Sequence, residues 1–207
     1  HVTRALSSFA GAKRRFESVY LSSRFHVVDD YGHHPTEIAA TLQTARSLEP
    51  GRIVTLFQPH RYSRTERLAE EFGKALQGAD LVFVTGIYAA SESPIKGISG
   101  MTILEAVERQ GSTKCVYHED LETVHHVVGN ALRSGDLLLT LGAGNVHEAG
   151  KRISDDLQLI DALESEFAES EMEVRLYESM RRHTTILVGG PAQFWICLLY
   201  TSDAADE

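Results

Sequence analysis

The sequence predicts an α/β fold in which helices cover both faces of a mostly parallel sheet. Short, nearly continuous apolar runs alternate along the chain with longer stretches whose apolar residues recur at helical spacing. Strands buried on both faces of a parallel sheet have this continuous apolar character, whereas half-exposed strands alternate apolar and polar residues. Hydrophobic residues make up 43% of the 207 residues, which is enough to form a substantial core.

The apolar runs and the amphipathic stretches follow one another from residue 25 onward. The runs predict strands at 25–28, 53–57, 81–84, 115–117 and 137–141. The stretches predict helices at 35–48, 65–76, 102–109 and 121–132. Pro35 suits the first turn of its helix, and Pro50-Gly51 ends that helix. A loop rich in Ser, Gly and Pro is expected at 89–100.

The pattern changes at Ile153. Residues 154–180 form an acidic helical stretch, which we interpret as a solvated helical connector. A new β pattern then runs from Arg181 to Ile196 around Gly189-Gly190-Pro191. An incomplete second domain is therefore expected after the connector.

Charge and composition argue against several classes of function. The formal net charge of −9 opposes nonspecific attraction to nucleic acid or to an anionic membrane. Cys115 and Cys197 lack metal-ligand spacing, so we expect neither a disulfide framework nor a cysteine zinc site, and a reducing cytoplasm fits best. No apolar run approaches the roughly 20 residues of a membrane helix. The chain begins at His1 rather than methionine, which suggests a true start upstream.

Polar side chains gather where the first predicted strand ends. The stretch DDYGHHPTE, Asp29 to Glu37, places two carboxylates, a phenol and two imidazoles just before a helix. Ligands of such sheets bind at the carboxyl ends of the strands, where a carboxylate is able to accept the hydroxyls of a ribose. A nucleotide or polar substrate site is therefore predicted. The alternative is a helix-start turn that Asp30 helps to cap.

A second polar segment, FQPHRYSRT, follows the next strand. Arg61 and Arg64 are three residues apart, so within a first helical turn they would be neighbours able to converge on one anion. Guanidinium groups suit a carboxylate or a phosphate, and the helix amino terminus adds to that field. Two unrelated surface arginines are the alternative interpretation.

Three further features leave alternatives open. His33, His34 and His60 are candidate metal ligands, as in a metal-dependent hydrolase, although a compact HxxxH motif is missing. His125-His126 lies within an amphipathic helix, where a structural role is expected. The turn Gly142-Ala143-Gly144-Asn145 lacks the Gly-Lys-Ser/Thr ending of a P-loop. Its glycines are expected to allow close approach of strand and helix, with anion binding as the alternative.

Together these motifs resemble the Mur ligases, in particular the type that adds L-alanine. DDYGHHPTE, FQPHRYSRT, the segment Lys13-Arg14-Arg15-Phe16-Glu17 and the GAGN turn occur in that family's order and spacing over about residues 1–150. The resemblance implies a Rossmann-like, doubly wound carboxy-terminal domain that closes over a UDP-sugar domain and a P-loop ATPase domain. It also implies ATP and Mg²⁺, bound mainly by the ATPase domain, with UDP-N-acetylmuramate and L-alanine as substrates.

The resemblance also assigns residue roles. Asp30 is expected to hold the ATP ribose, and Arg15 to approach the γ-phosphate. The side facing alanine is expected to be formed by Tyr31, His33, His60, Arg61 and Arg64. The two arginines would bind the carboxylate of alanine. No complete catalytic set and no metal site are expected in this fragment, which would be inert alone for lack of a P-loop. A related ligase that attaches a tripeptide to the same sugar lacks QPHRYSRT, so this stretch favours a free amino acid.

The tail carries a second resemblance. Residues 182–192, RHTTILVGGPA, resemble the start of UDP-N-acetylenolpyruvoylglucosamine reductase, a flavin enzyme whose FAD site would be incomplete here. Residues 197–207, CLLYTSDAADE, read like a translated sequencing adapter. The end of the ATPase domain is expected at 1–15 and the Mur ligase carboxy-terminal domain at 16–152. The connector follows at 153–180, the start of the reductase at 181–196 and the artefact at 197–207. A non-catalytic nucleotide- or anion-binding module is a further alternative.

Overall fold

The computed structural model describes residues 13–168, 186–188 and 194–196. Its main sheet has six strands in the order β1-β2-β6-β3-β4-β5. They are β1 (Glu17–Leu21), β2 (Phe25–Asp30), β3 (Arg52–Phe57), β4 (Leu81–Val84), β5 (Lys114–Tyr117) and β6 (Asp136–Leu141). Every neighbouring pair is parallel except β1 with β2, which confirms the prediction of a mostly parallel sheet. A separate antiparallel pair joins β7 (Ile186–Val188) to β8 (Phe194–Ile196).

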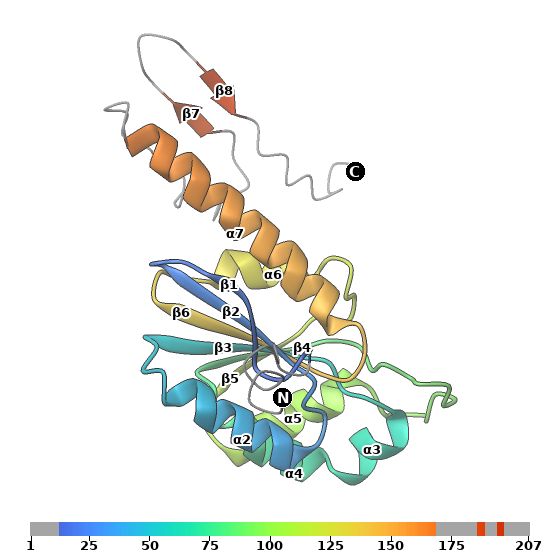
Figure 1. The fold of residues 1–207 in the computed structure, drawn as a ribbon. Coiled ribbons are helices and arrows are strands. Elements are labelled where there is room, and N and C mark those ends of the chain that lie inside the picture. The colour runs from blue at the N-terminus through green and yellow to red at the C-terminus, as the bar shows by residue number, and fades with distance from the viewer. Residues whose placement is uncertain (1–12, 169–185, 189–193, 197–207) are drawn as a thin grey trace, which may run out of the picture.

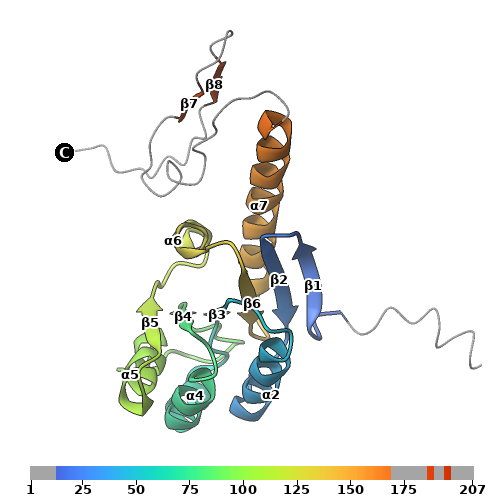
Figure 2. The ribbon, with the colours of Figure 1, turned by 90° about the vertical axis from the view of Figure 1, so that its left-hand side faces the viewer.

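Helices cover both faces of the main sheet, as predicted (Figures 1 and 2). One face carries α2 (Pro35–Arg46), α4 (Ala69–Leu76) and α5 (Gly100–Gln110). The other face carries α6 (Val124–Ala131) and α7 (Val146–Ala168). The short helix α3 (Tyr62–Arg67) lies beyond the strand ends, where the chain leaves β3 (Figure 1). The sheet is therefore covered by helices on both faces.

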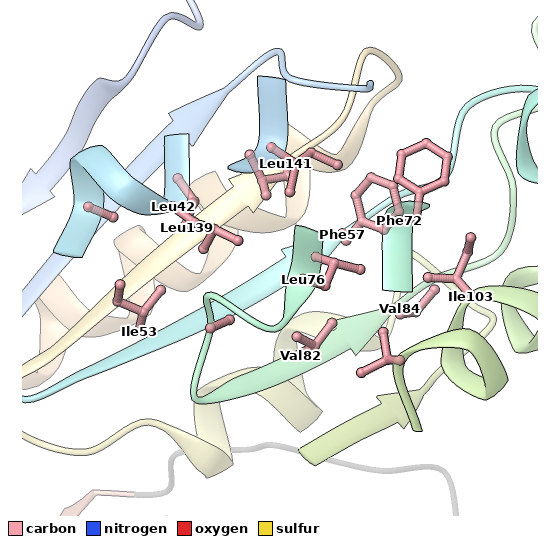
Figure 3. Close-up of a cluster of buried hydrophobic side chains, with 14 of the residues drawn as sticks. Leu42, Ile53, Phe57, Phe72, Leu76, Val82, Val84, Ile103, Leu139 and Leu141 are labelled. Atoms are coloured by element: carbon pink, nitrogen blue, oxygen red, sulfur yellow. The ribbon is translucent and has the colours of Figure 1, made fainter. Parts of the chain in front are cut away.

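The strands bury side chains on both faces, which explains their continuous apolar sequences. Leu139 and Leu141 of β6 point toward α2, α4 and α5 (Figure 3), whereas Leu138 packs with α6 and α7. The Phe57 ring of β3 lies 5.3 Å, centroid to centroid, from the Phe72 ring of α4. Truncating a fully buried leucine such as Leu139 to alanine is expected to cost about 2–5 kcal/mol.

The strand β1 was not predicted. It lies at the edge of the sheet, and its Val19 and Leu21 are exposed. Only Tyr20 packs against the core, and its hydroxyl donates a hydrogen bond to Asp161 of α7. Because an exposed edge strand needs neither a continuous apolar run nor a clean alternation, the sequence pattern gives no signal for it.

Two of the predicted helices differ from the observed helices by more than two residues at one end. The stretch 65–76 is part of two helices, because the chain leaves helical geometry at Leu68, with φ −115° and ψ 20°. The helix predicted from 121 begins at Val124. Before it, the Asp120 carboxylate accepts hydrogen bonds from the N–H of Glu122 and the hydroxyl of Thr123, which stabilises a turn.

The acidic segment after Ile153 is not a solvated connector over its first half. Helix α7 begins at Val146, and Ile153, Leu157 and Ile160 are buried against the sheet. Apolar residues three and four apart line one face of a helix, so the acidic residues between them lie on other faces. The described helices include none with the length and apolarity of a membrane span. Residues 1–12, 169–185, 189–193 and 197–207, with the predictions made for them, lie outside the described residues.

Candidate functional site

The loops after β2, β3 and β6 meet where these strands end, at the carboxyl edge of the sheet. Strand β6 lies between β2 and β3, and Leu141 at its end pairs with both Asp30 and Phe57. This register brings the turn 31–34 and the segment 58–61 to either side of the glycine turn 142–145. The sequence prediction that these two polar segments share one edge of the sheet is confirmed.

Asp29 and Asp30 end β2 and are buried, with 4% and 7% of their surface exposed. The Asp30 carboxylate accepts hydrogen bonds from the N–H of Phe16 at 2.8 Å and of Gly32 at 2.7 Å. It also accepts one from the Thr41 hydroxyl at 3.3 Å. A carboxylate has roughly four lone-pair positions, so about one remains for a ligand hydroxyl. Asp30 therefore fixes the turn, and the interpretation in which it caps the helix is wrong.

The cap of α2 is His34. Its Nδ1 accepts a hydrogen bond from the N–H of Thr36 at 3.4 Å, and Glu37 accepts from the N–H of His34 at 3.2 Å and of His33 at 3.0 Å. Burial acts to raise the pKa of Glu37, but these N–H groups and the His33 ring outweigh it, so the pKa lies below its ordinary value. This capping box fixes the chain between Asp30 and the helix.

Arg61 and Arg64 differ in their surroundings. Helix α3 begins at Tyr62, so Arg61 is the N-cap residue and lies outside the helical turn. Its φ of +72° is a left-handed value that is strained for a residue with a Cβ atom, and its side chain is exposed. Arg64 is half-buried, and its Nη1 donates a 3.4 Å hydrogen bond to the carbonyl of His33. Arg64 therefore connects the loops after β3 and β2.

Four aromatic rings form a row across these loops. The ring centroids of Tyr31 and His33 are 5.3 Å apart, those of His33 and His60 are 5.6 Å apart, and Tyr88 stacks on His60 at 5.5 Å. Burial lowers the pKa of His60, and the charges of Arg64, His33 and Arg61 lower it further. His60 is therefore uncharged at neutral pH. Its buried Nδ1 has no hydrogen-bond partner among the residues that the structure describes.

Arg15 and its neighbour Arg14 have different roles. Arg15 is exposed, and its guanidinium carbon lies 5.9 Å from the centroid of the Tyr31 ring. Arg14 is largely enclosed and donates to Asp29 at 2.7 Å and to the carbonyls of Gly142 at 2.6 Å and Gly144 at 2.9 Å. Arg14 was not predicted as a site residue. Its partners are distant in the chain, and an Arg-Arg pair does not show which member is enclosed.

The glycine turn after β6 packs closely against its neighbours. Gln58 accepts a hydrogen bond from the N–H of Val146 at 3.2 Å and donates one to Asn145 at 3.0 Å. A Cβ atom at Gly144 would lie 2.4 Å from Gln58 Oε1 and 2.6 Å from Cγ of Tyr88. Glycine at position 144 therefore allows the side chains of Gln58 and Tyr88 to pack closely against the turn, whereas close approach of strand and helix was predicted.

The histidines do not form a three-ligand metal set. His34 is exposed and its ring is engaged in capping α2. Within residues 13–168 and the two short described strands, no cluster of three or more His, Cys, Asp or Glu side chains is arranged to hold a metal ion. The rings of His125 and His126 lie 3.9 Å apart in the first turn of α6.

Comparison with known proteins gives matches to one family. A family model described as "Mur ligase, glutamate ligase domain" matches residues 14–144. The UDP-N-acetylmuramate–L-alanine ligase of Desulforamulus reducens is 46% identical over 157 residues, which cover 76% of this chain and 34% of that protein. The protein of the same name from Mycobacterium sp. (strain JLS) is 47% identical, covering 74% and 32%. This chain thus spans about one third of the length of these curated relatives.

Solved structures show the same relationship. The crystal structure of UDP-N-acetylmuramate-alanine ligase MurC from Thermotoga maritima matches with a TM-score of 0.62 and 32% identity, covering 76% of this chain and 33% of that one. A murein peptide ligase from Psychrobacter arcticus matches with a TM-score of 0.57 and 22% identity, covering 72% and 31%. The second match shows the fold alone. The Rossmann-like, doubly wound fold is confirmed by these similarities.

Proposed function

Because the chain belongs to the Mur ligase family, we propose that it is the carboxy-terminal domain of an ATP-dependent ligase that joins L-alanine to UDP-N-acetylmuramate. The observation that carries this proposal is the hydrogen bond from Arg64 to the carbonyl of His33. It brings a carboxylate-binding guanidinium group next to the loop that starts at Asp30. Both parts of the proposed site, for nucleotide and for amino acid, therefore face one edge of the sheet.

On the alanine side, Arg64 and Arg61 would bind the carboxylate. A guanidinium group forms paired hydrogen bonds with a carboxylate, which fixes its orientation as well as its position. His60 is uncharged at neutral pH, and the centroid of its ring lies 5.6 Å from that of the His33 ring. The amine of alanine is then left free to react. These side chains contribute mainly positioning, which accounts for much of the catalysis in reactions of this kind.

On the nucleotide side, Asp30 and Arg15 are the proposed contacts. The single acceptor position left on Asp30 fits one ribose hydroxyl, and the exposed Arg15 is available to a phosphate. In the proposed reaction the lactyl carboxylate of the sugar becomes an acyl phosphate using ATP, and the amine of alanine then displaces phosphate. Mg²⁺ would be held mainly by the ATPase domain and would neutralise phosphate charge.

The decisive experiment uses the chain joined to its proposed upstream domains. We expect ADP release that depends on alanine, and Arg64→Ala is expected to raise the KM for alanine about tenfold or more while the KM for ATP stays within about twofold. Arg67→Ala is the matched control, because Arg67 is exposed and lies on the same helix. Unchanged use of alanine by Arg64→Ala would contradict the assignment of this residue.

Three alternatives are outcomes of simple tests. If the joined ligase preferred a tripeptide over free alanine in the same assay, the chain would be part of the recycling type. The presence of Arg61 and Arg64 argues against this type. Titration of the 207-residue chain with ATP, alanine and zinc addresses the others. Binding of ATP without ligase activity in the joined protein would favour a non-catalytic module, and tight zinc binding a metal-dependent hydrolase.

The tail supports a narrower proposal. We propose that residues 181–196 begin a reductase that is fused to the ligase and that residues 197–207 come from an adapter sequence. The described strands β7 and β8 are short and pair with each other. Sequencing the coding DNA across codon 197 tests the second part, since adapter bases would be present only in an artefact.

A further inference from the structure

The loop between β4 and α5 makes an unassigned contribution to the proposed site. This loop, residues 85–99, lies beside α3 in Figure 1, where it is drawn in green. Two of its side chains, Tyr88 and Glu92, contact the segment that carries Arg61 and Arg64. Neither was predicted as a site residue from the sequence.

Helix α3 has no cap from its own sequence. Arg61 occupies the N-cap position and makes no side-chain hydrogen bond to the helix. Glu92 takes this role from the neighbouring loop: it accepts hydrogen bonds from the N–H of Ser63 at 3.0 Å and from the Ser63 hydroxyl at 2.7 Å. A carboxylate at this end of a helix satisfies a donor that would otherwise have no intrahelical partner.

The charge state of Glu92 agrees with this geometry. The N–H of Ser63 lowers the pKa of Glu92 below its ordinary value, with smaller contributions from the Ser63 hydroxyl and the charge of Arg61. The carboxylate is therefore ionised at neutral pH and faces the first turn of α3.

Tyr88 fixes the residues just before α3. Its N–H donates to the carbonyl of Pro59 at 2.8 Å, and its own carbonyl accepts from the N–H of Arg61 at 2.8 Å. These two bonds form a short parallel bridge between His60 and Tyr88. They hold Arg61 in its left-handed conformation, which directs the chain from β3 into the helix.

We infer that Glu92 is a positioning residue for Arg61 and Arg64, because it holds the amino end of α3 at Ser63, between the two arginines. Tyr88 holds the preceding residues, so the same loop fixes the segment at two points. The inference rests on the proposed function only for the identity of the ligand, the carboxylate of alanine. Its geometric part concerns this chain alone.

The geometric part is tested by NMR on the 207-residue chain. The Nε–Hε signals of Arg61 and Arg64 are compared in the original chain, in Glu92→Gln and Glu92→Ala, and in Ser63→Ala, which removes only the hydroxyl bond. We expect both arginine signals to shift in the Glu92 variants and less in Ser63→Ala. Glu66→Gln is the matched control, because Glu66 is an exposed carboxylate on α3 itself. In Glu66→Gln the Nε–Hε signals of Arg61 and Arg64 are expected not to shift.

The functional part is measured in the joined ligase. Glu92→Ala is expected to raise the KM for alanine about tenfold. Loss of a helix cap changes the equilibrium between the ordered and the frayed helix end by about a factor of ten. The KM for ATP and kcat are expected to change less than about twofold, and Glu66→Gln is expected to change none of these values. A folded Glu92→Ala variant with unshifted arginine signals overturns the inference. Shifted signals with an unchanged KM for alanine would instead contradict the proposed role of the arginines and leave the positioning intact.

Discussion

Arg14 Nε donates a 2.7 Å hydrogen bond to Oδ2 of Asp29, which joins the segment before β1 to the end of β2. The same guanidinium group donates to the carbonyls of Gly142 and Gly144 in the glycine turn. Asp29 is fixed in turn by the hydroxyl of Thr140, which donates to Oδ1 at 2.6 Å. One side chain thus connects the segment that carries Arg15 to two strand ends.

Replacing Arg14 by lysine is expected to destabilise the domain. Lysine keeps the charge but cannot reach a carboxylate and two carbonyls with one planar group, so the free energy of unfolding is expected to fall by about 2 kcal/mol. Urea unfolding followed by circular dichroism measures the change. Arg15→Lys is the control: because Arg15 is exposed, its effect on stability is expected to stay below about 0.5 kcal/mol. Equal stability of Arg14→Lys and the original chain would contradict the bridging role.

Adding one methyl group at Gly144 is expected to disrupt the site edge. The new Cβ atom would overlap Gln58 and Tyr88, at 2.4 and 2.6 Å from their nearest atoms, so Gly144→Ala is expected to cost about 2 kcal/mol of unfolding free energy. Gly129 in α6 has open space around it. Gly129→Ala is therefore expected to stabilise the chain by about 0.5–1 kcal/mol, through helix propensity alone. Similar melting temperatures for both variants would argue against close packing at the glycine turn.

Stability is expected to fall as the solution becomes mildly acidic. Burial lowers the pKa values of His26, His60 and His125 below the ordinary value of 6.5. Below that value the unfolded chain binds more protons than the folded chain, so unfolding becomes easier as pH falls from about 6.5. Above about 6.5 this contribution to stability is fully present.

The measurement is the free energy of unfolding at pH 7 and pH 5. The original chain is expected to lose stability between these values, and His60→Gln is expected to lose less, because one of the three histidines is then absent. His147→Gln, a change at an exposed position, is expected to behave like the original chain. A pH dependence that His60→Gln leaves unaltered would show that His60 does not contribute to it.

Much of the candidate site was predictable because it lies at strand ends. Asp30 and Arg61 follow continuous apolar runs, and strands that form one parallel sheet must end at the same edge. That rule brings the loops of Arg64 and His33 to the same end of the sheet, but their hydrogen bond depends on how the two loops pack, because β6 separates β2 from β3. Arg15, in the segment before β1, was predicted as a site residue only through the family resemblance. The sequence of β1 gives no strand signal that would have placed this segment beside β2.

The fold class, the central strands and the two polar loops could be predicted from local patterns of residues, because burial on both faces of a sheet requires a continuous run of apolar residues. The enclosure of Arg14, the capping of α3 by Glu92 and the burial of the first half of α7 depend on packing in three dimensions. Arg14 and Gly144 are 130 residues apart, and Glu92 and Ser63 are 29 apart. Contacts over such separations depend on how strands and loops pack in space, and no local pattern of residue types encodes them.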